Sequence, residues 1–321
     1  MPFLKENIFG LDIGYETIKV IQLKRAGSLF KLVTGGASLS PREPFSKINV
    51  KDKKALSTAI KKAINDFHIS SRLAVSALPE SLVFTKIIQM PKMTPEELAN
   101  AVPLETASFI PFEPEQTYLD FQIITDLGKN YEILVIAAPK TLVDDIIETL
   151  KVAGLSLVAL ETKPLANIRA LIAPVSREIS MILDIGAQTS SLTICEGSVI
   201  KFTATMSIGS HILQRIITSL SKVPQETEIL KGKKAIETIL ESLTEKALDG
   251  VKYYQAHKGK KIQQIFVVGG GAKMPGLTEH LTKKLGIKTE PGNPWRFIVN
   301  PPKQTDTLQG TTAVGLAMRA I

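Results

Sequence analysis

The sequence is poor in cysteine and histidine, and it has no long apolar run. Cys195 is the single cysteine among 321 residues, which excludes an internal disulfide framework and fits a reducing compartment. Because Cys195 lies in the apolar run 191–195, we expect a buried strand residue there and not a reactive thiol. The four histidines are scattered without metal-ligand spacing. Residues 1–9 lack the apolar core of a signal peptide, and no segment approaches the length of a membrane span.

Motifs for nucleic-acid binding are also missing. The formal net charge is +8, from 39 lysine and arginine residues against 31 acidic residues. The lysines are spread along the chain, with small clusters at 51–54 and 258–261, and no basic stripe is interleaved with aromatic residues. We therefore expect no nucleic-acid partner and interpret the charge as a solvated surface. Attraction to an anionic membrane surface is the alternative interpretation.

The chain contains an internal repeat. Residues 11–17 read Leu-Asp-Ile-Gly-Tyr-Glu-Thr, and residues 183–189 read Leu-Asp-Ile-Gly-Ala-Gln-Thr. In both copies an apolar run leads into Asp-x-Gly and a β-prone segment follows, so each copy predicts a β-hairpin. With 44% hydrophobic and 22% charged residues, the chain has the balance of a globular protein and the length for two domains. A repeat spaced by about half the chain indicates duplicated domains and not a solenoid.

Helical and strand patterns alternate along the rest of the sequence. In the first half we expect helices over 51–67 and 141–152, a helix that starts at Thr94, and strands over 73–77, 83–90, 118–125 and 131–138. The elements from 83 to 154 predict a compact α/β insert in the first half. In the second half we expect helices over 211–221, 226–252, 277–285 and 311–320, and a buried strand over 265–268.

Three glycine-containing turns follow predicted strands, at 12–14, 184–186 and 269–271. A tight turn with glycine lets backbone N–H groups approach phosphate oxygens closely. The Asp of each hairpin suits a hydrated Mg²⁺ ion, because Mg²⁺ keeps waters that carboxylates hold. Each turn alone is a weak signal, and the chain has neither a Walker A sequence nor G-x-G-x-x-G after a strand. The combination predicts two hairpins that grip a polyphosphate from both sides.

In this order the motifs resemble those of the actin-like ATPase superfamily, and the resemblance covers essentially the whole chain. Residues 9–19 and 183–194 look like its two phosphate motifs, and residues 267–277 are similar to its adenosine motif. Residues 227–231 resemble the helix that flanks adenine and ribose in MreB-like members, and residues 309–317 look like the closing helix.

The predicted insert separates the members of this superfamily. Actin, Hsp70 and MreB lack such an insert, whereas FtsA and PilM carry one at this place. Residues 109–115, followed by 118–121, are similar to a segment typical of the PilM family of type IV pilus assembly proteins. The alternatives are an FtsA-like cell-division protein, which usually continues beyond the closing helix, and a small-molecule kinase, for which no catalytic base has sequence support.

The resemblance implies an α/β actin-like ATPase fold made of two duplicated lobes. The implied boundaries are a first lobe over 1–82, the insert over 83–154 and a second lobe over 155–321, whose closing helix at about 309–321 packs back on the first lobe. It further implies a cytoplasmic protein that lies at the inner membrane through a PilN-like membrane protein, whose cytoplasmic N-terminal tail binds a groove on the first lobe. No transmembrane span is expected, and self-association into a platform is left open.

The resemblance also implies ATP and Mg²⁺ as ligands. The implied nucleotide-binding residues are Asp12, Gly14, Tyr15, Thr17, Lys19, Gly186, Ala187, Gln188, Thr189, Glu228, Lys231, Gly269, Gly270, Gly271 and Lys273. Asp12 and Asp184 would hold hydrated Mg²⁺, and Glu228 and Lys231 would frame the adenosine.

The position that usually orients the attacking water holds Lys163 in this chain, where relatives carry Glu or Gln. A protonated lysine can only donate a hydrogen bond, so we expect at most slow ATP hydrolysis. Glu161 is the alternative catalytic residue if the following helix begins only after Pro164.

Overall fold

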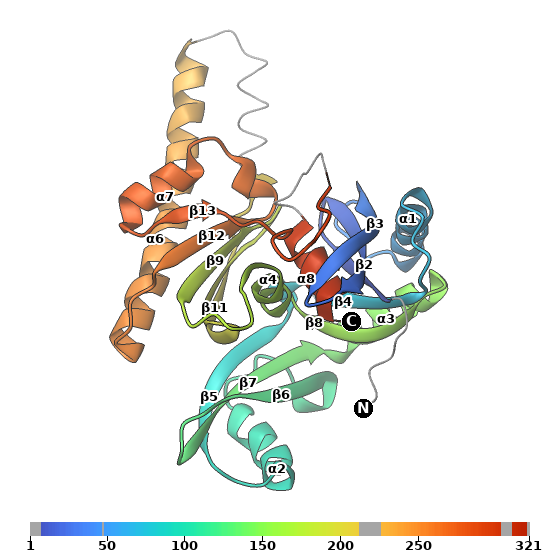
Figure 1. Cartoon of the computed structure of the whole chain (residues 1–321), viewed down its shortest axis with the longest axis vertical. Coiled ribbons are helices and arrows are strands. Elements are labelled where there is room, and N and C mark those ends of the chain that lie inside the picture. Colours follow the sequence, from blue (N-terminus) through green and yellow to red (C-terminus); the bar gives the residue numbers. More distant parts are fainter. Residues whose placement is uncertain (1–7, 47, 212–225, 303–309, 320–321) are drawn as a thin grey trace.

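The computed structural model describes residues 8–46, 48–211, 226–302 and 310–319 (Figure 1). Three β-sheets organise the chain. The first sheet has the strand order β3-β2-β1-β4-β8 and the second has the order β11-β10-β9-β12-β13. A smaller sheet has the order β5-β7-β6. The chain therefore contains two large lobes and one insert.

The first sheet combines an antiparallel meander with two parallel strands. Its strands are β1 (Ile8–Ile13), β2 (Thr17–Ala26), β3 (Leu29–Leu39), β4 (Leu73–Leu78) and β8 (Ser156–Thr162). β1 is antiparallel to β2, with Asp12 opposite Lys19, and parallel to β4, with Leu11 opposite Ser76. All six residues of β1 are buried, which is the pattern of a strand covered on both faces.

The second sheet repeats this arrangement. Its strands are β9 (Ile179–Ile185), β10 (Ser190–Glu196), β11 (Val199–Met206), β12 (Gln264–Val268) and β13 (Thr289–Pro291). β9 is antiparallel to β10 and parallel to β12, as β1 is to β2 and β4. The helices α6 (Glu226–Lys258) and α7 (Leu277–Leu285) belong to this lobe (Figure 1). The predicted duplication is therefore confirmed, while the helix expected over 211–221 lies outside the described residues from position 212 onward.

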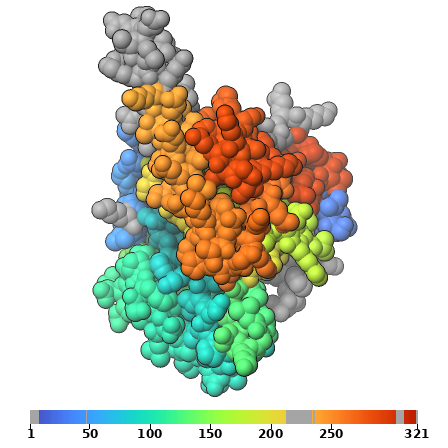
Figure 2. Space-filling view, turned by 90° about the vertical axis from the view of Figure 1, so that its left-hand side faces the viewer, coloured from blue at the N-terminus to red at the C-terminus, as the bar shows by residue number. Residues whose placement is uncertain are grey.

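The insert is a separate small sheet with its own helix. It contains β5 (Phe84–Pro91), α2 (Pro95–Thr106), β6 (Thr117–Asp126) and β7 (Asn130–Pro139). α2 begins at the expected capping signal, since Thr94 accepts from the backbone N–H of Glu97 and the Glu97 side chain accepts from that of Thr94. Figure 2 shows the insert, coloured cyan to green, below the orange residues of the second lobe.

Two expected domain boundaries need correction. α3 (Lys140–Val152) was placed in the insert, but its residues Leu142, Ile146 and Leu150 are buried in one core with α1 (Lys53–Asp66) and β1. β8 was placed in the second lobe, but it pairs in parallel with β4 of the first sheet. The insert sheet therefore ends at Pro139, because the chain returns to the first lobe for α3 and β8.

Two short helices lie between the large sheets. Ala166 of α4 (Lys163–Leu171) is buried with first-sheet residues, whereas Ile168 of α4 packs with second-sheet residues (Figure 1). α8 (Thr311–Arg319) packs on β1 so closely that a Cβ on Gly10 would lie 2.2 Å from the carbonyl oxygen of Ala313. A Cβ on Gly315 would lie 1.9 Å from the carbonyl oxygen of Ala166. Glycine at these two positions lets α8 dock against β1 and α4.

Candidate functional site

The two repeated turns have the same hydrogen-bond geometry. The N–H of Gly14 donates to the carbonyl oxygen of Thr17 at 3.0 Å, and the N–H of Gly186 donates to that of Thr189 at 3.0 Å. A Cβ on either glycine would lie 2.8 Å from the same carbonyl oxygen. Both hairpins therefore need glycine to turn this tightly.

The third turn connects β12 to the 3₁₀ helix η3 (Gly270–Lys273). Gly269 has φ +83°, and a Cβ there would lie 2.4 Å from Asp184 Oδ1. A side chain at position 269 is thus excluded both by backbone conformation and by the neighbouring carboxylate. Because Gly269 has no side chain, its backbone can lie close to the Asp184 carboxylate.

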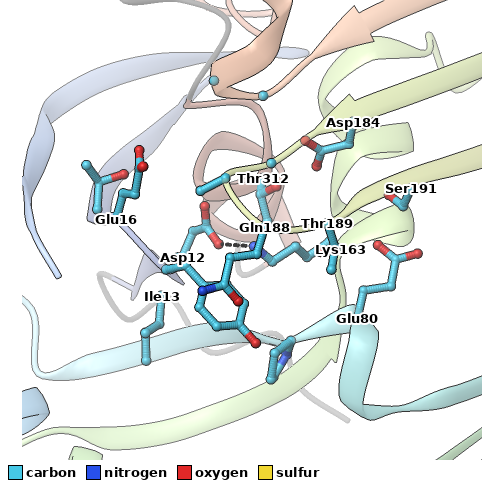
Figure 3. A pocket seen from close by; sticks show the side chains of 18 of the residues that line it. Asp12, Ile13, Glu16, Glu80, Lys163, Asp184, Gln188, Thr189, Ser191 and Thr312 are labelled. Atoms are coloured by element: carbon cyan, nitrogen blue, oxygen red, sulfur yellow. Dashed lines mark ion pairs between the residues drawn. The ribbon is translucent and has the colours of Figure 1, made fainter. Parts of the chain in front are cut away.

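One cleft brings these turns together (Figure 3). It lies beyond the carboxyl ends of the parallel pairs β1–β4 and β9–β12, which is where open α/β sheets bind ligands. Its empty volume is about 930 Å³ when open solvent at the mouth is included. Its charged lining consists of Asp12, Glu16, Glu80, Asp184, Lys19 and Lys163.

Asp12 is buried and forms two ion pairs. Lys163 Nζ lies 3.0 Å from Asp12 Oδ1, and Lys19 Nζ lies 3.5 Å from Asp12 Oδ2 (Figure 3 draws the first pair). Burial alone would raise the pKa of Asp12, but the two ammonium groups outweigh burial and hold the pKa below its ordinary value. Burial would likewise lower the pKa of Lys163, yet Asp12 and Asp184 raise it. Lys163 is therefore a cation at neutral pH.

Asp184 belongs to a polar chain that joins the lobes. Thr312 Oγ1 of α8 donates to Asn167 Oδ1 of α4 at 2.9 Å, and Asn167 Nδ2 donates to Asp184 Oδ2 of β9 at 2.9 Å. Burial raises the pKa of Asp184, and Lys163 and Asn167 offset this only in part. The cleft end of β9 is thus positioned by helices that also contact the first sheet.

The carboxylates of the cleft limit how a metal ion could bind. Among the described residues, no group of three or more His, Cys, Asp or Glu side chains could hold a metal ion. Asp12 is already paired with two lysines, so direct coordination would have to displace Lys163. The donor set therefore fits a hydrated Mg²⁺ held through water beside Asp12 and Asp184, and does not fit a dehydrated ion in a protein cage.

The structure brings most of the expected ligand residues to the cleft. Those that line it are Asp12, Gly14, Tyr15, Thr17, Lys19, Lys163, Asp184, Gly186, Ala187, Gln188, Thr189, Gly269 and Gly270. Gly271 and Lys273 are not among the lining residues: Gly271 packs on Ile185, and Lys273 is exposed on η3. The side chains of Glu228 and Lys231 lie outside those that the structure describes.

Glu161 is not brought to the cleft. Its carboxylate accepts two hydrogen bonds from the Arg169 guanidinium, at 2.7 and 2.9 Å, and also pairs with Arg319. α4 begins at Lys163 and not after Pro164, so Glu161 is the buried penultimate residue of β8. The flexible lead-in that a catalytic Glu161 requires is absent at this point of the chain.

Several cleft residues were missed from the sequence. Glu80, Ser191, Ser210, Thr311 and Thr312 line the cleft. Glu80 follows the predicted strand over 73–77 closely, and a carboxylate just past the carboxyl end of a strand was a usable signal. The paired hydroxyls at Thr311 and Thr312, which open an apolar helix, were a second signal.

The duplicated sheets, the central helices and the glycine-lined cleft define an α/β protein with the actin-like ATPase fold. The family model described as type IV pilus assembly protein PilM matches residues 10–321. The chain therefore belongs to the PilM family of type IV pilus assembly proteins.

Several known proteins resemble this chain over most of its length. A structure titled as the PilM-PilN type IV pilus biogenesis complex is 27% identical, with a TM-score of 0.87 over 98% of this chain and 99% of that chain. The cell division protein FtsA of Streptococcus pneumoniae is 21% identical over 346 residues, which span 89% of this chain and 75% of FtsA. The ethanolamine utilization protein EutJ of Carboxydothermus hydrogenoformans shares the fold, at a TM-score of 0.56 and 17% identity over 99% of this chain and 91% of EutJ.

Within the described ranges, no helix is both long enough and apolar enough to span a membrane.

Proposed function

We propose that this protein binds ATP with hydrated Mg²⁺ between its lobes and hydrolyses it slowly at most. We further propose that it binds the cytoplasmic N-terminal tail of a PilN-like membrane protein, and through it lies at the inner membrane in a type IV pilus assembly platform. The observation that carries the nucleotide claim is the facing pair of Asp-x-Gly turns in one cleft. The observation that carries the partner claim is the likeness to a PilM-PilN complex over nearly the whole chain.

Charge supports a magnesium complex over the free nucleotide. Four carboxylates and two ammonium groups line the cleft, so it is net negative before any phosphate enters. An added polyphosphate then needs a cation to offset repulsion from those carboxylates that the two lysines do not pair with. Gly14, Gly186 and Gly269 line the cleft without a side chain that would stand between the backbone of these turns and a phosphate.

The nucleotide claim is tested by calorimetry of ATP binding with Mg²⁺ and with a chelator. The native chain is compared with Asp184→Ala and with the matched control Asp66→Ala, which alters an exposed residue of α1. We expect the native chain and the control to bind ATP in Mg²⁺, and Asp184→Ala to lose at least tenfold in affinity. Absence of ATP affinity in the native chain under both conditions contradicts the proposal.

A second cavity supports the site of the tail. Its lining includes Gln122 of β6 in the insert, Phe30 of β3 in the first lobe and Ser198 between β10 and β11. Ile168 and Ile172 supply further apolar lining from α4 and its end. β6 is an edge strand of the insert sheet, so an extended peptide could pair with it while its side chains occupy the apolar lining.

Peptide binding is measured by fluorescence anisotropy with a labelled PilN-like tail. Ser198 is exposed and lines this cavity, so Ser198→Trp fills its mouth without altering a buried side chain. We expect at least a tenfold loss of tail affinity with ATP binding unchanged, and no loss in the control Lys61→Trp on α1. Full tail affinity in Ser198→Trp would place the groove elsewhere on the protein.

A further inference from the structure

Glu80 lies in a turn of the first lobe that has a counterpart in the second lobe. β4 of the first lobe corresponds to β12 of the second, and each is followed by a 3₁₀ turn, η1 (Glu80–Leu82) and η3 respectively. Glu80 is the first residue of η1, as Gly270 is of η3, and both line the cleft. The second lobe thus presents backbone to the cleft where the first presents a carboxylate.

The Glu80 carboxylate reaches across to the second lobe. It accepts a hydrogen bond from Thr203 Oγ1 of β11 at 3.2 Å and a second from the hydroxyl of Ser191 in β10. Figure 3 shows it directed toward Ser191, on the side of the cleft that holds Lys163. A carboxylate has about four lone-pair sites, so these two donors fix its orientation and leave it able to accept a further proton.

The surroundings of Glu80 bring the pKa of its carboxyl group close to neutral pH. Burial raises the pKa of Glu80 to about 7, the repulsion of Asp184 adds to this, and Ser191, Lys163 and Thr203 act in the opposite direction. The charged groups that face it are therefore Asp184 of β9 and Lys163 of α4. A carboxyl group of this kind exchanges protons at physiological pH, which suits a general base.

We infer that Glu80 is the proton acceptor for ATP hydrolysis in this cleft, in place of the acidic or amide residue expected at the position of Lys163. The inference rests on the proposed ATP binding. Water attacks the γ-phosphorus, and a new P–O bond forms. The bond from that phosphorus to the bridging oxygen breaks, and ADP leaves with that oxygen. The proton of the water passes to a Glu80 carboxylate oxygen and then to solvent.

The other side chains of the cleft are less suited to this role. Lys163 can only donate, and Asp12 is held by two ammonium groups. One oxygen of Asp184 accepts from Asn167, and the other lies against the backbone of Gly269. Glu16 is exposed at the turn of the first hairpin and lies 3.8 Å from His211. Glu80 combines orientation by two hydroxyls with a position on the cleft wall.

Single-turnover ATP hydrolysis by the full chain tests this role across pH 5.5–8.5. We expect Glu80→Gln to lower the rate by roughly 10²–10⁴-fold, since that is the usual contribution of general-base catalysis. The native rate should rise with pH as Glu80 loses its proton, and this rise should vanish in Glu80→Gln. Glu148→Gln, which changes an exposed carboxylate of α3, is the matched control and should keep the native rate and profile.

The outcomes separate this inference from the proposed function. ATP affinity and thermal unfolding of each variant are measured beside the rates, and Glu80→Asp provides a variant that keeps the carboxylate. An unchanged rate in Glu80→Gln, a lower rate with the same pH profile, or loss of ATP binding in that variant overturns the role of Glu80. A native chain that binds ATP without measurable hydrolysis also overturns it. A native chain that does not bind ATP refutes the proposed function itself.

Discussion

A buried ion-pair cluster joins the insert to the second lobe, and its removal gives a measurable loss of stability. Glu132 of β7 is 2% exposed, and its two oxygens pair with Lys201 of β11 at 2.5 Å and with Lys258 of α6 at 2.6 Å. Lys201 also donates to Thr125 Oγ1 at 2.6 Å. Glu132→Gln keeps the shape of the side chain but leaves two cations near an uncharged amide.

The magnitude follows from the pKa of Glu132. Burial opposes ionisation, but Lys201 and Lys258 outweigh it and lower the pKa from 4.5 to about 2. A pKa lowered by this much corresponds to roughly 3 kcal/mol of stabilisation. The Lys258 side chain is 34% exposed, so solvent screens its share, and we expect a loss of about 2–3 kcal/mol at pH 7.

The pH dependence has a definite sign. Because the folded pKa of Glu132 lies below the unfolded one, its stabilisation is complete above pH 4.5 and is lost as the pH falls toward 2. The stability difference between native chain and Glu132→Gln should therefore be smaller at pH 3 than at pH 6, by about 1–2 kcal/mol.

Urea unfolding followed by circular dichroism at both pH values measures these differences. The control is Asp66→Asn, which removes an exposed i,i+4 pair with Lys62 and should cost less than about 1 kcal/mol. A loss below about 1 kcal/mol for Glu132→Gln at pH 7, or the same loss at pH 3 and pH 6, refutes the reasoning.

Three further predictions concern separate parts of the chain. Gly315→Ala should destabilise the protein by about 1–3 kcal/mol, because the added Cβ meets the backbone of α4. The single tryptophan, Trp295, lies in the core around α8, so its fluorescence reports unfolding. An unchanged melting temperature contradicts the packing described. Lys163→Glu in a Glu80→Gln background, at saturating Mg·ATP, should restore part of the single-turnover rate, since a carboxylate accepts from water where lysine donates; no recovery over Glu80→Gln alone argues against it. Burial raises the pKa of Cys195 to about 12, so a thiol reagent at pH 8 should label it only after urea is added, and rapid labelling of the folded chain contradicts its burial.

The local parts of the fold could be predicted from the sequence. Both hairpins were predicted because Asp-x-Gly between β-prone runs is a turn signal contained within a few residues. The start of α2 was predicted for the same reason, from the capping residues that begin at Thr94. The duplication followed from comparing the two hairpin sequences, which needs no knowledge of long-range contacts.

Long-range pairing was the part that could not be predicted. β8 joins β4 across the whole insert, and a parallel pair leaves no turn between its strands to reveal the partner. α3 was assigned to the insert by its neighbours in sequence, yet its apolar face packs with α1. The predicted boundaries at 83, 154 and 155 were drawn from the order of the elements along the chain. In the structure, each lobe is defined by the sheet that its elements join.

The site shows the same distinction between local and distant signals. The glycines and aspartates of the hairpins line the cleft, and their positions follow from the turns themselves. Glu161 was the alternative catalytic residue because it lies two positions before Lys163. Its partners in the fold, Arg169 and Arg319, are 8 and 158 residues away, and the sequence did not indicate either pairing. A carboxylate at a strand end has the same local sequence signal whether it faces a cleft or a buried guanidinium.

The repeat also explains where the two halves of the cleft differ. Lys19 stands opposite Asp12 in the first hairpin, and Ser191 stands at the matching place opposite Asp184 in the second. Lys19 pairs with its own aspartate, whereas Ser191 donates to Glu80 of the other lobe. The backbone hydrogen bond is the same in both turns, so the duplication produced two turns of one geometry. The chemistry of the cleft then depends on the few side chains, Glu80 and Lys163 among them, that the second copy does not repeat.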